Sequence, residues 1–216
     1  MRSFASFLAF VLAPSFALAE DWQPLFNGKD LAGWRATNDP DSFTVKDGIL
    51  RCQASGKRPA HLLYVGEHKM GFEKFKNFEL EARVKSEPNA NGGIFIHTSK
   101  ATRDAGKVLD EGYEVQLNSS PREPRKTGSL YAIVDLDESP VDETKWFTIR
   151  IVVKEKRITV AINGKEVVDY TEPPDPKRTP ERAGRVLAAE GGAIALQAHD
   201  LRSVWYFKEI KVKKLP

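Results

Sequence analysis

The 216-residue sequence has a single cysteine, Cys52, so no disulfide can form within the chain. One thiol also excludes a metal site built mainly from thiolates. No neighbour of Cys52 in the sequence would activate its sulfur, and we expect a buried, inert side chain rather than a nucleophile. The fold must therefore hold together without a disulfide framework.

The sequence also lacks a strong excess of either charge, since 33 basic and 30 acidic residues leave a formal net charge of +3. Such a mixed surface argues against a nucleic-acid partner. Beyond the N-terminal segment there is no apolar run long enough for a membrane span. No protein partner can be inferred from the sequence.

Residues 1–19 have the pattern of a secretory signal peptide. Arg2 supplies the positive charge, residues 4–16 form an apolar run too short for a membrane helix, and Ala17-Leu18-Ala19 is a small-x-small cleavage site. The pattern predicts a periplasmic or secreted protein. Residues 20–216 are long enough for one domain with its own core.

The dominant hydrophobic period in the rest of the chain is two. In residues 78–84, 113–118 and 147–153, apolar side chains alternate with polar or charged ones, as in half-buried strands. Asn163-Gly164 separates two further β-rich runs and predicts a hairpin with a type I′ turn. With further strands at 193–199 and 204–213, the pattern indicates an all-β antiparallel sandwich or barrel.

The segment 171–192 interrupts this pattern. It holds four prolines and many charges before Gly191-Gly192. Strands resume directly after it, so we interpret it as a surface loop crossing the sandwich, with a short helix near 180–189.

Seven short motifs follow one another along the chain in the order of a known family. They are Leu25-Phe26-Asn27-Gly28-Lys29-Asp30-Leu31-Ala32-Gly33-Trp34, Val45-Lys46-Asp47-Gly48-Ile49-Leu50, Phe78-Glu79-Leu80-Glu81-Ala82-Arg83, Asn91-Gly92-Gly93-Ile94-Phe95-Ile96, Gly112-Tyr113-Glu114-Val115-Gln116-Leu117, Thr127-Gly128-Ser129-Leu130-Tyr131 and Ile194-Ala195-Leu196-Gln197-Ala198-His199. Over nearly the whole chain after residue 21, the sequence resembles the DUF1080 family of 3-keto-disaccharide, or 3-keto-glucoside, hydrolases. The resemblance implies a concanavalin A-like jelly-roll sandwich of two curved antiparallel sheets, with a carbohydrate site on a concave outer face.

Polar residues inside these motifs are the candidate site. Strand alternation combined with the resemblance predicts two catalytic residues, Glu114 and His199, and four substrate-binding residues, Gln116, Gln197, His97 and Tyr131. The chain departs from the family pattern at His97, where many relatives have arginine, and at Lys208-Glu209, where Arg-Asn is common. Such departures leave open a non-catalytic carbohydrate-binding module on the same sandwich.

The family's chemistry requires few groups. A ketone at C3 acidifies the hydrogen on C2, a base removes it, the C1 substituent leaves by β-elimination, and water adds afterwards. Glu114 or His199 could be the base and the other the acid, with amides or a divalent cation stabilising the enolate. His97, His199 and Glu114 are acceptable ligand types for a cation, which the sequence does not require. A conventional retaining glycosidase needs two carboxylates, and strand 113–118 offers only one.

Overall fold

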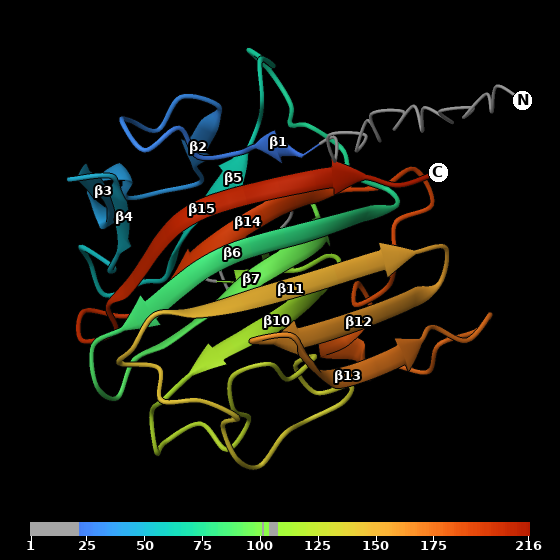
Figure 1. Ribbon diagram of the computed structural model, residues 1–216. Helices are drawn as coiled ribbons and strands as arrows, with labels where there is room; N and C mark the ends of the chain where they lie inside the picture. The colour runs from blue at the N-terminus through green and yellow to red at the C-terminus, as the bar shows by residue number, and fades with distance from the viewer. Residues whose placement is uncertain (1–21, 101, 104–107) are drawn as a thin grey trace, which may run out of the picture.

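The computed structural model describes residues 22–100, 102–103 and 108–216, which form two antiparallel β-sheets packed face to face (Figure 1). The expected all-β sandwich is therefore confirmed. The predicted signal peptide, 1–19, lies outside the described residues. In the part of the chain that is described, no helix has the length and hydropathy that crossing a bilayer requires.

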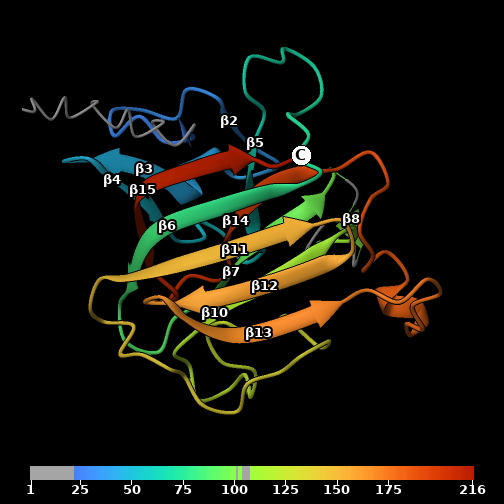
Figure 2. The same ribbon diagram turned by 45° about the vertical axis from the view of Figure 1, so that its right-hand side comes forward.

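The larger sheet has eight strands and lies toward the viewer in Figure 1, and the turned view in Figure 2 shows the second sheet behind it. Its order is β13 (Lys165–Thr171), β12 (Arg157–Ile162), β11 (Phe147–Lys154), β6 (Phe78–Ser86), β15 (Trp205–Lys214), β4 (Ile49–Cys52) and β3 (Phe43–Lys46), with β1 (Gln23–Pro24) paired to β15.

The smaller sheet has five strands. Its order is β10 (Tyr113–Asn118), β7 (Asn91–Thr98), β14 (Ala193–Ala198), β5 (Ala60–Tyr64) and β2 (Trp34–Ala36). A two-stranded ribbon, β8 (Thr102–Arg103) with β9 (Val108–Leu109), stands apart from both sheets.

The predicted hairpin joins β12 to β13. Asn163 and Gly164 both have positive φ, 49° and 81°, as a type I′ turn requires. The turn brings Ile162 opposite Lys165 and fixes the register of the two strands. A β-bulge follows at Val160/Ala161.

The core fills the space between the sheets. Its members include Trp34 and Trp205, which are therefore packing residues. Cys52 is buried and free, and burial raises the pKa of its thiol. The inert role expected for this side chain agrees with its surroundings.

The loop 171–192 contains only a 3₁₀ turn, Pro180–Arg182, so the prediction of a helix near 180–189 was wrong. Side-chain contacts with the sheets hold the loop instead. Glu172 accepts hydrogen bonds from the hydroxyl of Tyr113 (2.6 Å), from Lys156 (2.7 Å) and from the backbone N–H of Leu187 (2.7 Å). A proline-rich loop anchored in this way does not need helical hydrogen bonds.

Candidate functional site

The outer face of the five-stranded sheet carries the candidate site. In β10, Tyr113, Val115 and Leu117 point into the core between the sheets. Their neighbours Glu114 and Gln116 therefore point outward, because side chains alternate along a strand. Both are nevertheless buried, at 8% and 2% exposure, since loops cover this face.

Two glycines in β7 make room for large side chains on opposite faces. A Cβ on Gly93 would meet the carboxylate oxygen Oε1 of Glu114 at 2.6 Å on the outer side. A Cβ on Gly92 would meet the ring of Trp205 at 2.8 Å on the core side. Any larger residue at 93 would therefore displace Glu114 from the site.

A small pocket on this face, about 100 Å³ in volume, is lined by five of the six predicted site residues. They are Glu114, Gln116, Tyr131, Gln197 and His199. Two further residues, Asn91 and Glu123, complete the lining. The residues come from three strands and two loops that are far apart in the sequence.

His97 is the sixth predicted residue, and the structure does not bring it to the pocket. In the pairing of β7 with β14, Phe95 lies opposite Ala195 and Thr98 lies opposite Ala193. Two residues of β7, Ile96 and His97, therefore lie opposite the single residue Ile194, which is a β-bulge. His97 has a φ of 52°, donates from Nε2 to the carbonyl of Lys76 (2.8 Å) and stacks on the core residue Phe78. The extra residue changes the alternation, so His97 does not share the face of Glu114, and the structure gives no support to its predicted role in substrate binding.

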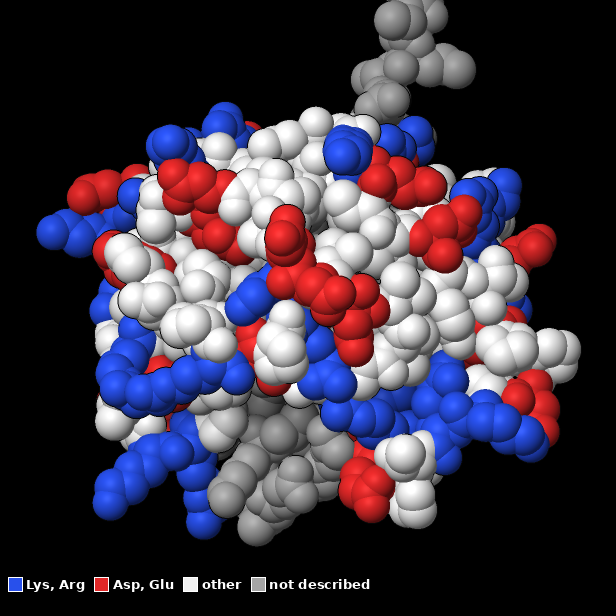
Figure 3. All heavy atoms as spheres, turned by 90° about the horizontal axis from the view of Figure 1, so that it is seen from below, with Lys and Arg blue, Asp and Glu red and all other residues white. Residues whose placement is uncertain are grey.

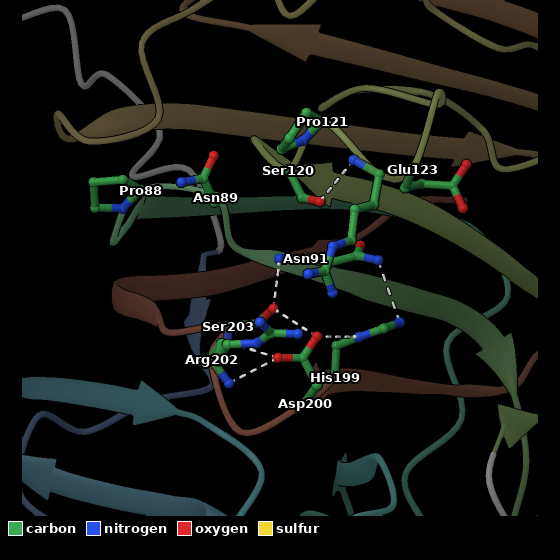
Figure 4. A pocket seen from close by; sticks show the side chains of 11 residues that line it. Pro88, Asn89, Asn91, Ser120, Pro121, Glu123, His199, Asp200, Arg202 and Ser203 are labelled. Carbon is green, nitrogen blue, oxygen red and sulfur yellow. Dashed lines mark hydrogen bonds and ion pairs between the residues drawn. The ribbon is translucent and has the colours of Figure 1, made fainter.

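A chain of hydrogen bonds crosses the pocket from a carboxylate to an amide (Figure 4). His199 Nδ1 lies 3.0 Å from Asp200 Oδ2, and its Nε2 lies 3.2 Å from the amide nitrogen of Asn91. Asn91 Oδ1 accepts from Gln116 Nε2 at 2.9 Å. With Nε2 accepting from Asn91, the ring proton sits on Nδ1 and points at Asp200, which orients the imidazole.

Asp200 is well suited to hold this ring. Burial raises its pKa, but hydrogen bonds from His199, from the Arg202 N–H and from Ser203 outweigh that effect and lower the pKa below its usual value. The carboxylate therefore stays ionised beside the imidazole. Asp200 and Asn91 were not assigned roles from the sequence, although Asp200 directly follows His199 and Asn91 begins a family motif.

A wider cavity of about 610 Å³ adjoins the small pocket and shares Asn91, Glu123 and His199 with it. We call the two together the groove. Figure 4 shows Pro121 and Glu123 on one side of the wide cavity and Arg202 and Asp200 on the other. Its volume lies in the range of small-molecule sites, whereas the small pocket alone can hold only part of a sugar.

Glu123 is a second carboxylate that sequence reasoning missed. It lies on a loop tied down by Asn118, whose Nδ2 donates to the carbonyls of Glu123 and Arg125, both at 2.8 Å. Its own Oε2 accepts from the Tyr131 hydroxyl at 3.1 Å. Burial, followed by the charge of Glu123, raises the pKa of Tyr131 and keeps its hydroxyl protonated. No strand periodicity marks such a loop residue.

Glu123 changes the argument about mechanism. The case against a retaining glycosidase was that only one carboxylate lies on strand 113–118. The groove brings in a second from another segment, so the number of carboxylates no longer excludes that chemistry.

His61 on β5 is a further residue that the sequence did not single out. It is fully buried, and its Nε2 lies 3.3 Å from the amide nitrogen of Gln197. Burial, followed by the charges of Arg185 and His199, lowers its pKa to about 3, so it is neutral at pH 7. A neutral His61 can accept from Gln197 and fix that amide at the pocket.

Several polar atoms at this site have no hydrogen-bond partner in the part of the chain that the structure describes. Buried and unpaired are Gln116 Oε1, Gln197 Oε1 and His61 Nδ1. Buried polar atoms are rarely left unpaired. The two amide oxygens belong to residues that line the pocket, although the oxygen atoms themselves are buried.

The described residues form no cluster of potential metal ligands. Among the described residues, no three or more His, Cys, Asp or Glu side chains gather closely enough to hold an ion. His97, one of the three ligand types considered from the sequence, lies away from the pocket. Lys208, the other departure from the family pattern, packs over the ring of Trp146 at 4.5 Å on the eight-stranded sheet.

Comparison with known proteins agrees with the motifs. The family model described as the 3-keto-alpha-glucoside-1,2-lyase-like domain matches residues 21–213. A protein from Bacteroides thetaiotaomicron named 3-keto-disaccharide hydrolase is 27% identical over 172 residues, covering 70% of this chain and 59% of that protein. The chain thus spans less than two thirds of that relative's length.

Solved structures share the fold. A presumed glycosyl hydrolase from Parabacteroides distasonis has a TM-score of 0.74 at 22% identity, covering 90% of this chain and 94% of its own. The carbohydrate-binding module CBM66 from Bacillus subtilis has a TM-score of 0.55 at 12% identity, covering 85% and 96%. At these identities the likeness concerns the sandwich alone.

Proposed function

The chain belongs to the family of 3-keto-alpha-glucoside-1,2-lyase-like domains, and from this premise we propose that it cleaves 3-keto-glycosides by β-elimination followed by hydration. The observation that carries the proposal is that Glu114 and His199, two groups able to move protons, line one pocket. Amides that can bind hydroxyl groups stand beside them. The relative named 3-keto-disaccharide hydrolase supports the same substrate class.

The reaction balances without a redox partner. The base takes the C2 proton, whose acidity the C3 ketone raises, and the C–H electrons form a C1–C2 double bond. The bond from C1 to the leaving oxygen breaks, and that oxygen takes its electron pair and a proton from the acid. Water then adds, with hydroxyl to C1 and hydrogen to C2.

The groove supports an assignment of roles. Glu114 lies in the small pocket only, so we assign it as the base at C2. His199 lies where the small pocket meets the wide cavity, and a leaving group that extends into that cavity would pass beside it. To act as an acid, His199 must also carry a proton on Nε2, so the hydrogen bond that Nε2 accepts from Asn91 has to be given up when substrate binds. Asp200 stabilises the resulting imidazolium through Nδ1. We assign Gln116, Gln197 and Tyr131, which line the same pocket, to bind the ketone oxygen or the hydroxyls.

A non-catalytic carbohydrate-binding module is the alternative. The support for it in the sequence was that His97 and Lys208 depart from the family pattern. Both lie outside the groove, His97 in the bulge against the core and Lys208 on the other sheet. These departures therefore do not argue against catalysis.

Export to the periplasm or cell exterior remains part of the proposal, and residues 1–19 are its support. N-terminal sequencing of protein recovered from outside the cytoplasm should find a chain that begins after Ala19. Recovery of an intact Met1 terminus from that fraction would contradict it.

Isotopic labelling tests the reaction. A 3-keto-glucoside deuterated at C2 should react more slowly when proton removal limits the rate, and turnover in heavy water should place deuterium at C2 of the product. Full retention of the C2 label, or equal cleavage of the unoxidised disaccharide, would contradict elimination. Sugar binding without turnover of any keto-sugar, with or without added divalent metal, would instead support the binding module.

A further inference from the structure

Two arginines from separate loops line the wide cavity beside the catalytic pocket. Arg122 belongs to the loop after β10, and Arg202 belongs to the loop between β14 and β15. Both are exposed, and among the described residues neither guanidinium has a hydrogen bond or an ion pair. Each carries five N–H donors and no acceptor.

The carboxylates of the same cavity already have partners. Glu123 accepts from Arg125 Nη1 at 3.2 Å and from the Tyr131 hydroxyl at 3.1 Å. Asp200 is bonded to His199 and to Ser203 Oγ, both at 3.0 Å. The charged groups that remain available to a ligand in this cavity are therefore the two cations.

The face of the molecule that carries the loop after β10 also has many basic side chains (Figure 3). Figure 3 looks onto the loops that lie lowest in Figure 1, which include the loop after β10. Lys and Arg gather along the lower part of this view, while Asp and Glu gather mainly above them. A cavity whose available charged groups are donors favours a ligand that only accepts, because guanidinium pairs with carboxylate and phosphate in forked geometry.

We propose that the wide cavity is a leaving-group subsite for an anionic sugar, held by Arg122 and Arg202 through a carboxylate or a phosphate ester. This proposal rests on the proposed function for the orientation of the substrate, since His199 at the junction separates the keto-sugar from its leaving group. The substrate class would then be acidic 3-keto-glycosides rather than neutral disaccharides.

The test uses 3-keto-disaccharides that differ only at C6 of the leaving glucose: a hydroxyl, a carboxylate or a phosphate. The wild-type protein should show a kcat/KM about five- to tenfold higher for an anionic form than for the neutral one, mostly through KM. Comparison of the carboxylate with the phosphate identifies the preferred anion. Added salt should reduce the preference.

The double variant Arg122→Gln/Arg202→Gln should bring the ratio of anionic to neutral substrate close to one. Lys165→Gln is the matched control, because it removes one exposed cation at the β12–β13 hairpin and should keep the wild-type ratio. Equal kcat/KM values for all three substrates in the wild type, or an unchanged ratio in the double variant, would overturn the proposal.

Calorimetric titration with the unoxidised disaccharides separates this proposal from the proposed function, because it needs no turnover. Tighter binding of the anionic forms that disappears in the double variant supports the subsite even if no keto-sugar is cleaved. Cleavage of keto-sugars without any anionic preference in binding supports the reaction and rejects the subsite.

Discussion

The polar side chains on the outer faces of the two sheets differ in how deeply they are buried. On the eight-stranded sheet, β6 and β11 alternate between buried and more exposed positions, and their outward charges form surface ion pairs such as Glu79–Arg150 (2.6 Å). On the five-stranded sheet, every residue of β10 and β14 is buried, including Glu114, Gln116 and Gln197.

This difference in burial distinguishes polar groups that water satisfies from polar groups that need a partner within the protein or a ligand. A polar group on the exposed face costs nothing to keep, since water satisfies it. A buried polar group without a partner costs about 1–3 kcal/mol. On the five-stranded sheet, the amide oxygens of Gln116 and Gln197 are buried without a hydrogen-bond partner among the described residues.

The largest expected effect is that of Glu114→Gln on the five-stranded sheet, and Glu79→Gln on the eight-stranded sheet is its control. Glu114→Gln should lower kcat for a 3-keto-glycoside by about 10²–10⁴, because the amide cannot accept the C2 proton. Glu79→Gln removes the same charge from the other sheet and should leave kcat within about twofold. Circular dichroism should show both variants folded. Equal losses in the two variants would break the comparison between the sheets.

His199→Ala should lower kcat by a similar factor, about 10²–10⁴, because protonation of the leaving oxygen is lost. A substrate with a better leaving group needs less help from an acid, so an aryl 3-keto-glucoside should lose less rate than a disaccharide. Steady-state kinetics on both substrates measures this. A uniform loss would argue against the acid role.

Gln116→Ala should reduce kcat/KM by about tenfold, less than the 10²–10³ lost with a dedicated oxyanion donor. An amide can orient substrate or stabilise charge but cannot transfer the proton. The variant also loses the hydrogen bond to Asn91 Oδ1 and leaves a buried cavity, so its thermal stability should fall, and the kinetics are measured well below its unfolding temperature. A loss as large as that of Glu114→Gln would give Gln116 a more central role.

The burial of His61 makes the stability of the folded protein depend on pH. Its folded pKa of about 3 lies below the unfolded value near 6.5, so below pH 6.5 the unfolded chain binds a proton that the folded chain does not. Stability therefore falls as pH drops from about 6.5 toward 3, by up to about 1.4 kcal/mol per pH unit. His97, whose pKa burial also lowers, acts in the same direction.

Urea unfolding at pH 7, 6 and 5 measures this slope. His61→Gln should remove one share of the slope and leave the share of His97. Carboxylates with lowered pKa values, such as Asp200, lose their contribution at lower pH and do not interfere in this window. An unchanged slope in His61→Gln would show that the folded protein does not exclude a proton there.

The smallest effect is expected on the eight-stranded sheet. Arg150 is half exposed, so Arg150→Gln should change the free energy of unfolding by no more than about 1 kcal/mol. The change should shrink with added salt. A loss comparable to that of a buried polar group would remove the distinction between the two faces.

Much of the fold and part of the site could be predicted from local pattern. The type I′ turn at Asn163-Gly164 follows from the positive φ that these residues tolerate, and Glu114 and Gln116 follow from period-2 alternation in β10. The same rule failed at His97, because a bulge adds one residue to β7 and reverses the facing. Glu123, Asp200 and His61 escaped notice, since their place in the groove depends on contacts with distant segments.

The sequence by itself determined the all-β class and the family. These follow from turn chemistry, alternation and motif order, all of which act over a few residues. Only the tertiary structure decided which groups share a pocket, because strands β10, β7 and β14 become neighbours through pairings that no local pattern specifies. It also decided which polar atoms lose their water, since burial depends on what the rest of the chain packs against them.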